Sequence, residues 1–151
     1  MLPLPDSVAA GLRAVRLPGR FQVLPGDPEW ILDVAHNAPA AEVLAANLAA
    51  RPCAGRTIAV AGILADKDVA AIGRILAPRV DAWILCGLEG PRGLDAVALR
   101  ERLAPVVAEA SLAPDVTAGC RLASAQARPG DRVVVLGSFH TVGPALEWLG
   151  V

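Results

Sequence analysis

The stretch that decides the fold is RVVVLG, residues 132–137, in which four consecutive apolar residues lead into a glycine. A strand that faces solvent on one side alternates apolar and polar residues, whereas this stretch has no polar side chain after Arg132. Fully apolar strands are typical of parallel sheets, which are covered on both faces. The motif therefore predicts a buried strand at 132–137.

Segments of strand and helix character alternate through the chain before this stretch. Ala41, Leu44 and Leu48 recur at helical spacing, and so do Val69, Ile72 and Leu76. Strands that alternate with helices predict an α/β fold with a parallel sheet and right-handed crossovers. The predicted strands are 30–33, 57–63 and 82–86, and the predicted helices are 38–50, 69–76 and 99–106, the last bent or split by Pro105.

The segments at the two ends of the chain complete the prediction. A short strand at 115–118, a helix at 121–127 and a C-terminal helix at 144–149 are expected from the sequence. Near the start, Arg13–Leu17 and Phe21–Leu24 are extended pieces next to proline-glycine turns, which predicts a β-hairpin that enters the sheet. Without repeats or low-complexity tracts, residues 1–151 are expected to form a single domain.

Composition excludes several classes of protein. Hydrophobic residues make up 54% of the 151 residues and charged residues 19%, which is too apolar for a disordered chain. The longest charge-free run, 133–146, is interrupted and too short to span a membrane, and a net charge of −1 gives nucleic acid no electrostatic advantage. The absence of a signal-peptide pattern and three scattered cysteines, expected to be buried thiols, predict a cytoplasmic protein.

Loops after four predicted strands hold the residues with the most versatile chemistry. Both histidines and the only lysine fall in these loops, although lysine and arginine together number 14. Open α/β sheets bind ligands at the carboxyl ends of their strands, so this clustering predicts a site there. The loops are 34–37, 66–68, 89–93 and 138–141.

Several of these residues also have a structural interpretation. Asn37, Asp66 and Ser138 stand where helix N-caps belong, and Asp68 would lie in a first helical turn. Other chemistries lack their motifs: the sequence has no G-x-x-x-x-G-K-[ST] loop for a triphosphate and no G-x-G-x-x-G after a strand. No dense set of ligand residues accompanies Asp33, so no metal site is predicted.

Five motifs in order carry a resemblance to a known family. Together they resemble the C-terminal domain of the folylpolyglutamate synthase/dihydrofolate synthase family, within the Mur ligase superfamily. The resemblance implies a Rossmann-like domain with a mostly parallel six-stranded sheet and helices on both faces. It also implies that the N-terminal P-loop ATPase domain of the family is absent from this chain. The motifs are GRFQ (19–22), LDVAHN (32–37), LADKD (64–68), LEGPRG (88–93) and GSFHTV (137–142).

The resemblance further implies a ligase reaction. ATP phosphorylates the carboxylate of dihydropteroate or a folate, and the amine of L-glutamate attacks the acyl phosphate to form an amide. The implied partners are ATP, L-glutamate, the folate substrate and the N-terminal domain, which would also hold Mg²⁺. The isolated domain is expected to be inactive, and no nucleic acid or membrane partner is expected.

Carried over by position, the resemblance assigns roles to individual residues. Arg20 and Asp33 are expected to bind nucleotide, Arg20 at a phosphate. His36 is expected to accept a proton or to line the glutamate pocket. Lys67, Ser138 and His140 are expected to bind glutamate, with Arg92 as a further candidate in a loop that Pro91 and two glycines also explain structurally.

One departure and two alternatives accompany this interpretation. The family usually has proline directly after His-Asn, whereas here Ala38 intervenes before Pro39, which still suits a first helical turn. The first alternative is another Mur-type ligase, acting on a peptidoglycan precursor, against which segments 88–93 and 137–142 argue. The second is a small-ligand-binding module without catalysis.

Overall fold

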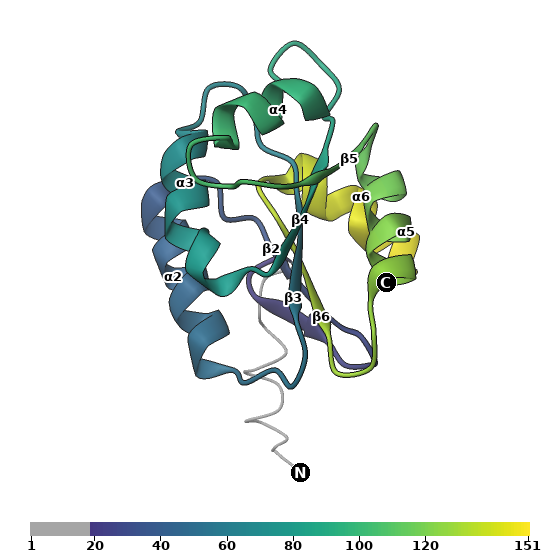
Figure 1. Ribbon diagram of the computed structural model, residues 1–151. Coiled ribbons are helices and arrows are strands. Elements are labelled where there is room, and N and C mark those ends of the chain that lie inside the picture. Colours follow the sequence, from purple (N-terminus) through teal and green to yellow (C-terminus); the bar gives the residue numbers. More distant parts are fainter. Residues whose placement is uncertain (1–18) are drawn as a thin grey trace, which may run out of the picture.

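The structure, a computed structural model, describes residues 19–151 (Figure 1). Its centre is a six-stranded sheet in the order β1-β2-β6-β3-β4-β5. β1 pairs with β2 in antiparallel orientation, and all other neighbouring strands are parallel. The predicted α/β class with a mostly parallel six-stranded sheet is confirmed. The strands are β1 (Gln22–Leu24), β2 (Glu29–Asp33), β3 (Thr57–Ala61), β4 (Ala82–Cys86), β5 (Ser111–Ala113) and β6 (Arg132–Leu136).

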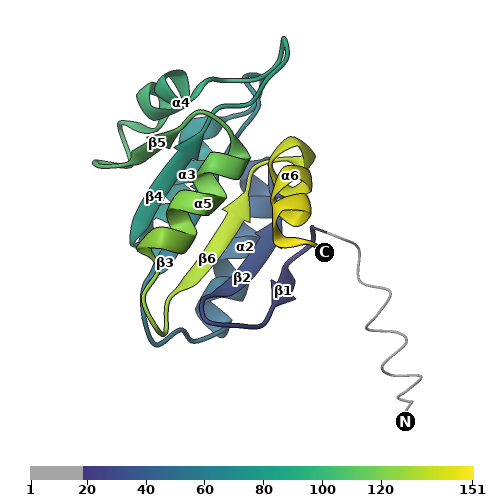
Figure 2. The ribbon, with the colours of Figure 1, turned by 90° about the vertical axis from the view of Figure 1, so that its right-hand side faces the viewer.

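Helices cover both faces of the sheet, as Figures 1 and 2 show from two sides. One face carries α2 (Ala38–Ala50), α3 (Val69–Leu76) and α4 (Ala96–Leu103), and the other carries α5 (Val116–Gln126) and α6 (Phe139–Leu149). A short 3₁₀ helix, η1 (Ala77–Arg79), follows α3. Within residues 19–151, no helix is long and apolar enough to cross a membrane.

The central strand β6 explains why its sequence has no polar side. Val134 and Leu136 face the core that α2, α3 and α4 cover, whereas Val133 and Val135 face the core under α5 and α6. Because side chains alternate along a strand, a continuous apolar run places two residues in each core. All four side chains are fully buried, which confirms the prediction made from this stretch.

Segment 115–118 does not form the predicted strand. The edge strand is β5, at 111–113, and Asp115 is instead the N-cap of α5, where its side chain accepts a hydrogen bond from the Ala118 amide at 2.8 Å. The β-branched residues after Asp115 favoured a strand, but the cap commits them to a helix that begins at Val116. The predicted helix at 121–127 is therefore the second half of a longer one.

Other boundaries differ because of caps and prolines. α4 ends at Leu103, so Pro105 follows the helix rather than bending it. α6 begins at Phe139, five residues before its predicted start, with Pro144 inside it. Near the start, the hairpin pairs β1 with β2, while Arg13–Leu17 lies outside the described residues.

The three cysteines divide into two kinds. Cys86 and Cys120 are fully buried, and burial raises the pKa of each thiol to about 12. Cys53 is only half-buried, with its sulfur 3.2 Å from the Gly130 carbonyl oxygen. The expectation of buried thiols is correct for two of the three.

Candidate functional site

The parallel pairing brings four polar loops to one edge of the sheet. β2, β6, β3 and β4 are neighbours in this order and run in the same direction, so the loops that follow them all leave at the carboxyl edge. Except for Arg20, which precedes β1, every sequence-predicted site residue lies at this edge: His36, Lys67, Arg92 and Ser138 in the loops, Asp33 at the end of β2 and His140 in the first turn of α6. The carboxyl edge is therefore the candidate site.

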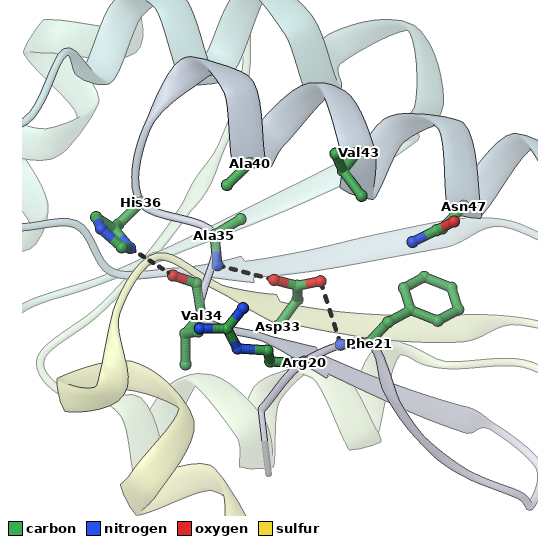
Figure 3. A pocket seen from close by; sticks show the side chains of 9 residues that line it. All are labelled: Arg20, Phe21, Asp33, Val34, Ala35, His36, Ala40, Val43 and Asn47. Carbon is green, nitrogen blue, oxygen red and sulfur yellow. Dashed lines mark hydrogen bonds between the residues drawn. The ribbon is translucent and has the colours of Figure 1, made fainter. Parts of the chain in front are cut away.

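A pocket of about 360 Å³ lies at the end of β2, against α2 (Figure 3). Three of its lining residues, Arg20, Asp33 and His36, were predicted as site residues. The others are mostly apolar and come from the turn before β1, the end of β2 and one side of α2. These others are Phe21, Val34, Ala35, Ala40, Val43 and Asn47.

Asp33 is held in place by the backbone on both sides of the pocket. One carboxylate oxygen accepts a hydrogen bond from the Ala35 amide at 2.9 Å, and the other accepts one from the Phe21 amide at 3.2 Å. Burial raises the pKa of Asp33, although these two amides and the charge of Arg20 favour its ionised form. The carboxylate therefore connects the turn that carries Arg20 to the end of β2.

The turn that presents Arg20 has an unusual backbone. Gly19 has a φ of 76°, and a Cβ at this position would press against the side chain of Val34. The Gly19 carbonyl accepts a hydrogen bond from the Val34 amide at 2.6 Å. Phe21 has a φ of 45°, in a region that non-glycine residues rarely adopt and that recurs at functional sites. The exposed Arg20 guanidinium is thus presented beside Asp33 by a rigid turn (Figure 3).

His36 is exposed and has one nitrogen committed. Nδ1 lies 3.0 Å from the Val34 carbonyl oxygen. Because a carbonyl can only accept, Nδ1 must carry the hydrogen, which leaves Nε2 as the acceptor in the neutral ring. The next residue, Asn37, caps α2 through a 2.9 Å bond to the Ala40 amide, as predicted. The geometry gives His36 the form a proton acceptor needs.

Ser138 is buried and has structural partners. Its hydroxyl accepts a hydrogen bond from the His140 amide at 2.9 Å, which makes it the predicted N-cap of α6. Thr141 Oγ1 donates its hydrogen to the Gly62 carbonyl at 2.6 Å, so Ser138 is the donor in the 3.4 Å contact between the two hydroxyls. A ligand can only donate to Ser138, as an amine would. His140, by contrast, is exposed.

Lys67 lies in the loop between β3 and α3, flanked by two carboxylates that are already used. Asp66 pairs with Arg92 at 3.0 Å, and Asp68 caps α3 by accepting from the Ala71 amide at 3.2 Å. The predictions of Asp66 as the cap and of Asp68 in the first turn were wrong, since the helix begins one residue after Asp68. Within residues 19–151, the Lys67 ammonium has no hydrogen bond or ion pair.

The predicted residues do not all share one pocket. Arg20, Asp33 and His36 meet in the first pocket. His140 lines a second pocket, of about 290 Å³, between the loop after β4 and the start of α5, where Glu89, Asp115 and Thr117 also lie. Lys67, Arg92 and Ser138 line neither. Among the described residues, no group of three or more histidine, cysteine or acidic side chains could hold a metal ion.

The side of α2 that lines the first pocket was missed by sequence reasoning. Ala40, Val43 and Asn47 recur at helical spacing but lie beside the core stripe of the same helix. Val43 is 61% exposed, which is high for a large aliphatic side chain. An apolar residue outside the core stripe was the available signal.

A family profile and several known proteins match this chain over most of its length. The profile of the family described as "Mur ligase, glutamate ligase domain" matches residues 19–139. The dihydrofolate synthase/folylpolyglutamate synthase of Escherichia coli is 42% identical over 142 residues, which are 94% of this chain and 33% of that protein. The corresponding enzyme of Mycobacterium tuberculosis is 33% identical over 96% of this chain and 33% of its own length.

Solved structures of such enzymes are also similar to this chain. The structure of E. coli FolC in complex with DHPP and ADP has a TM-score of 0.86 at 40% identity, and the match covers 95% of this chain and 34% of that chain. A bifunctional folylpolyglutamate synthase/dihydrofolate synthase with Mn, AMPPNP and L-glutamate bound has a TM-score of 0.85 at 42% identity, over 97% of this chain and 35% of the other. The chain thus spans about a third of the length of these relatives.

Proposed function

Because the chain belongs to the Mur ligase family, whose glutamate ligase domain it matches, we propose that it is this domain of a folylpolyglutamate synthase/dihydrofolate synthase. The proposed reaction adds L-glutamate to dihydropteroate or a reduced folate at the expense of ATP. The observation that carries this proposal is the first pocket, where an exposed guanidinium, a half-buried carboxylate and an imidazole with a free Nε2 meet at the carboxyl edge. We also propose the cytoplasm as the location.

Arg20 and Asp33 are the proposed nucleotide residues. A guanidinium suits phosphate oxygens because it offers several fixed donors with a permanent charge. Asp33 keeps the turn of Arg20 in register with β2, and its carboxylate borders the same pocket. The relatives crystallised with ADP or AMPPNP support a nucleotide in this family.

His36 is the proposed proton acceptor. In the reaction, the glutamate nitrogen bonds to the carbonyl carbon of the acyl phosphate, the bond from that carbon to the phosphate oxygen breaks, and phosphate leaves. The amine must lose a proton, and Nε2 of His36 is the acceptor that this pocket provides. Its 3.0 Å bond through Nδ1 keeps the ring in that tautomer.

Lys67 is the proposed partner of a glutamate carboxylate, with Ser138 and His140 as further contacts. Both neighbouring carboxylates are engaged elsewhere, which leaves the ammonium available for a ligand. ATP-dependent ligases also need a divalent cation, which we propose to be Mg²⁺. We propose that the domain with which this one works supplies the protein ligands for this cation.

The proposal is tested in a full-length ligase that carries this domain. We expect ATP-dependent addition of glutamate to dihydropteroate and none to a muramyl nucleotide; the opposite preference would assign the domain to peptidoglycan synthesis. Lys67→Ala should raise the KM for glutamate roughly tenfold to over a hundredfold. This range corresponds to the loss of one hydrogen bond to a charged group, which is worth about 1.5–3 kcal/mol. Lys67→Arg should recover part of this loss. An equal loss for all three substrates would remove Lys67 from the glutamate site.

A further inference from the structure

The loop that carries Lys67 is held by contacts from a distant part of the chain. Leu64 forms an isolated antiparallel bridge with Gly93, and the Ala65 amide donates to the Arg92 carbonyl at 2.7 Å. These contacts fix the beginning of the loop. The segment from Ala65 to Lys67, which orients the lysine, depends on a further contact.

Arg102, at the end of α4, makes that contact. Its Nη2 donates to the Ala65 carbonyl at 2.8 Å, and its Nη1 donates to the Lys67 carbonyl at 3.3 Å. A guanidinium is planar, so its two terminal nitrogens keep a fixed separation and direction. One side chain therefore fixes the carbonyls on both sides of Asp66, and with them the peptide that leads into Lys67.

α4 is a rigid support for this side chain. Leu103, next to Arg102, is 1% exposed and packs against Gly73 of α3. The fit is close enough that a Cβ at Gly73 would collide with the Leu103 side chain. α3 itself begins just after the Lys67 loop, at the Asp68 cap. The fork of Arg102 and the loop that it holds thus belong to one packed unit.

We propose that Arg102 is a positioning residue for glutamate binding, which acts by fixing the backbone of the loop that presents Lys67. The proposal rests on the proposed function of Lys67 as a ligand for glutamate. Arg102 itself touches neither substrate nor nucleotide in this scheme. Its two bonds lie at an exposed position, so we expect a moderate effect rather than loss of activity.

A matched control is present in the same helix. Arg100 is also exposed and also lies in the last turn of α4, where a cation suits the helix dipole. Within residues 19–151 it makes no hydrogen bond or ion pair. Arg100→Met therefore removes the same charge from the same helix end without touching the Lys67 loop.

The first test measures the loop directly in this chain. The Val69 amide donates to the Lys67 carbonyl at 3.0 Å, and the Lys67 amide donates to the Leu64 carbonyl at 3.2 Å. We expect Arg102→Met to speed hydrogen exchange at these two amides roughly three- to tenfold, the effect expected from the loss of one hydrogen bond. Arg100→Met should leave both exchange rates unchanged. Unchanged exchange in Arg102→Met would overturn the proposal whether or not the domain binds glutamate.

The second test measures kinetics in the full-length ligase. Arg102→Met should raise the KM for glutamate about three- to tenfold with kcat and the KM for ATP unchanged, and Arg102→Lys should recover part of the loss. In a Lys67→Ala background, Arg102→Met should have no further effect on glutamate, because the two residues act through one contact. An equal effect in both backgrounds would refute positioning through Lys67. If Lys67→Ala has no effect while the ligase is active, the assignment of Lys67 fails instead.

Discussion

The two edges of the sheet differ in how completely certain polar side chains are bonded within the protein. At the amino edge, where the parallel strands begin, Arg132 is 6% exposed and all three of its nitrogens donate within the protein: Nε to Thr57 Oγ1 at 2.8 Å, and the others to the carbonyls of Arg51 and Leu48 at 2.6 and 3.2 Å. At the carboxyl edge, His36 and Lys67 keep Nε2 and the ammonium without partners in the described residues.

The difference separates structural charge from functional charge in this fold. Asp131 at the amino edge accepts from the Arg56 and Arg128 amides at 2.7 and 2.9 Å and pairs with the Arg56 side chain at 3.0 Å. These bonds join the beginnings of β3 and β6. A charge whose bonds are all internal stabilises the fold, whereas the unpaired ammonium of the half-buried Lys67 is available to a ligand.

The largest expected effect is loss of stability on replacing Arg132 with methionine. The substitution keeps an unbranched side chain but removes the donor to the Thr57 hydroxyl and to the Arg51 carbonyl, while the Leu48 carbonyl keeps its bond from the Arg51 amide at 3.2 Å. Leaving a buried polar group unsatisfied costs about 1–3 kcal/mol, so we expect the two groups together to cost about 2 kcal/mol or more. Urea unfolding measures it.

Arg121→Met is the control for Arg132→Met. Arg121 is exposed on α5 and makes no hydrogen bond in the part of the chain that the structure describes. Its replacement should change the free energy of unfolding by less than about 0.5 kcal/mol. Equal losses for both arginines would contradict a structural role specific to the amino edge.

The next expected effect is at the carboxyl edge and concerns catalysis. In a full-length ligase that carries this domain, Arg20→Ala should slow the ATP-dependent step roughly tenfold to over a hundredfold. This factor corresponds to the loss of one charge-assisted hydrogen bond, which is worth about 1.5–3 kcal/mol. Steady-state kinetics with varied ATP measures this. The same variant should unfold at the same urea concentration as wild type, since Arg20 is exposed. A parallel loss of stability would place Arg20 among the structural charges.

Which residues lie at the carboxyl edge was largely predictable from the sequence, because local patterns of apolar residues determine where the strands begin and end. The run in β6 predicted a doubly covered sheet, and the order of segments predicted which loops share the carboxyl edge. Arg20, Asp33 and His36 were predicted as site residues, and the structure places them in one pocket. Their roles stay predictions.

What sequence could not give are contacts between distant segments. Nothing in the local pattern around Arg102 or Arg132 distinguishes them from the exposed Arg100 or Arg121, because their partners lie 35 to 84 residues away in the chain. The sequence also did not show that Asp66 pairs with Arg92 while Asp68, directly before the first residue of α3, caps the helix. Caps depend on one hydrogen bond, so boundaries such as the start of α5 were misjudged.

A smaller effect should depend on pH at the amino edge. Hydrogen bonds from the Arg128 and Arg56 amides hold the pKa of Asp131 below its usual range. A carboxyl group with a lowered folded pKa adds stability above its unfolded pKa, and this stability is lost as pH falls through the folded value. Asp131→Asn should therefore be about 1.5 kcal/mol less stable than wild type at pH 7.

Measuring urea unfolding of Asp131→Asn and wild type from pH 7 to pH 2 tests this sign. The gap between the two proteins should narrow once pH falls below the ordinary aspartate range, about 3.9, because protonated aspartate resembles asparagine. A gap that stays constant across the range would mean that folding does not lower the pKa of Asp131, and it would contradict a charge-dependent contribution to stability.

The smallest expected effects come from two neighbours at the carboxyl edge. His36 and Asn37 are both exposed, and each makes one hydrogen bond through its side chain. The bond from His36 is made by an exposed side chain, so His36→Ala should change stability by less than about 0.5 kcal/mol. Asn37 accepts from a free amide in the first turn of α2, so Asn37→Ala should cost about 1 kcal/mol.

Urea unfolding of both variants, with glutamate-addition rates in the full-length ligase, separates the two roles: His36→Ala should lose rate and keep stability. If His36→Ala were the more destabilised variant, the imidazole would have to be counted with the structural groups, and the contrast between the two edges would fail at the residue proposed to accept the proton.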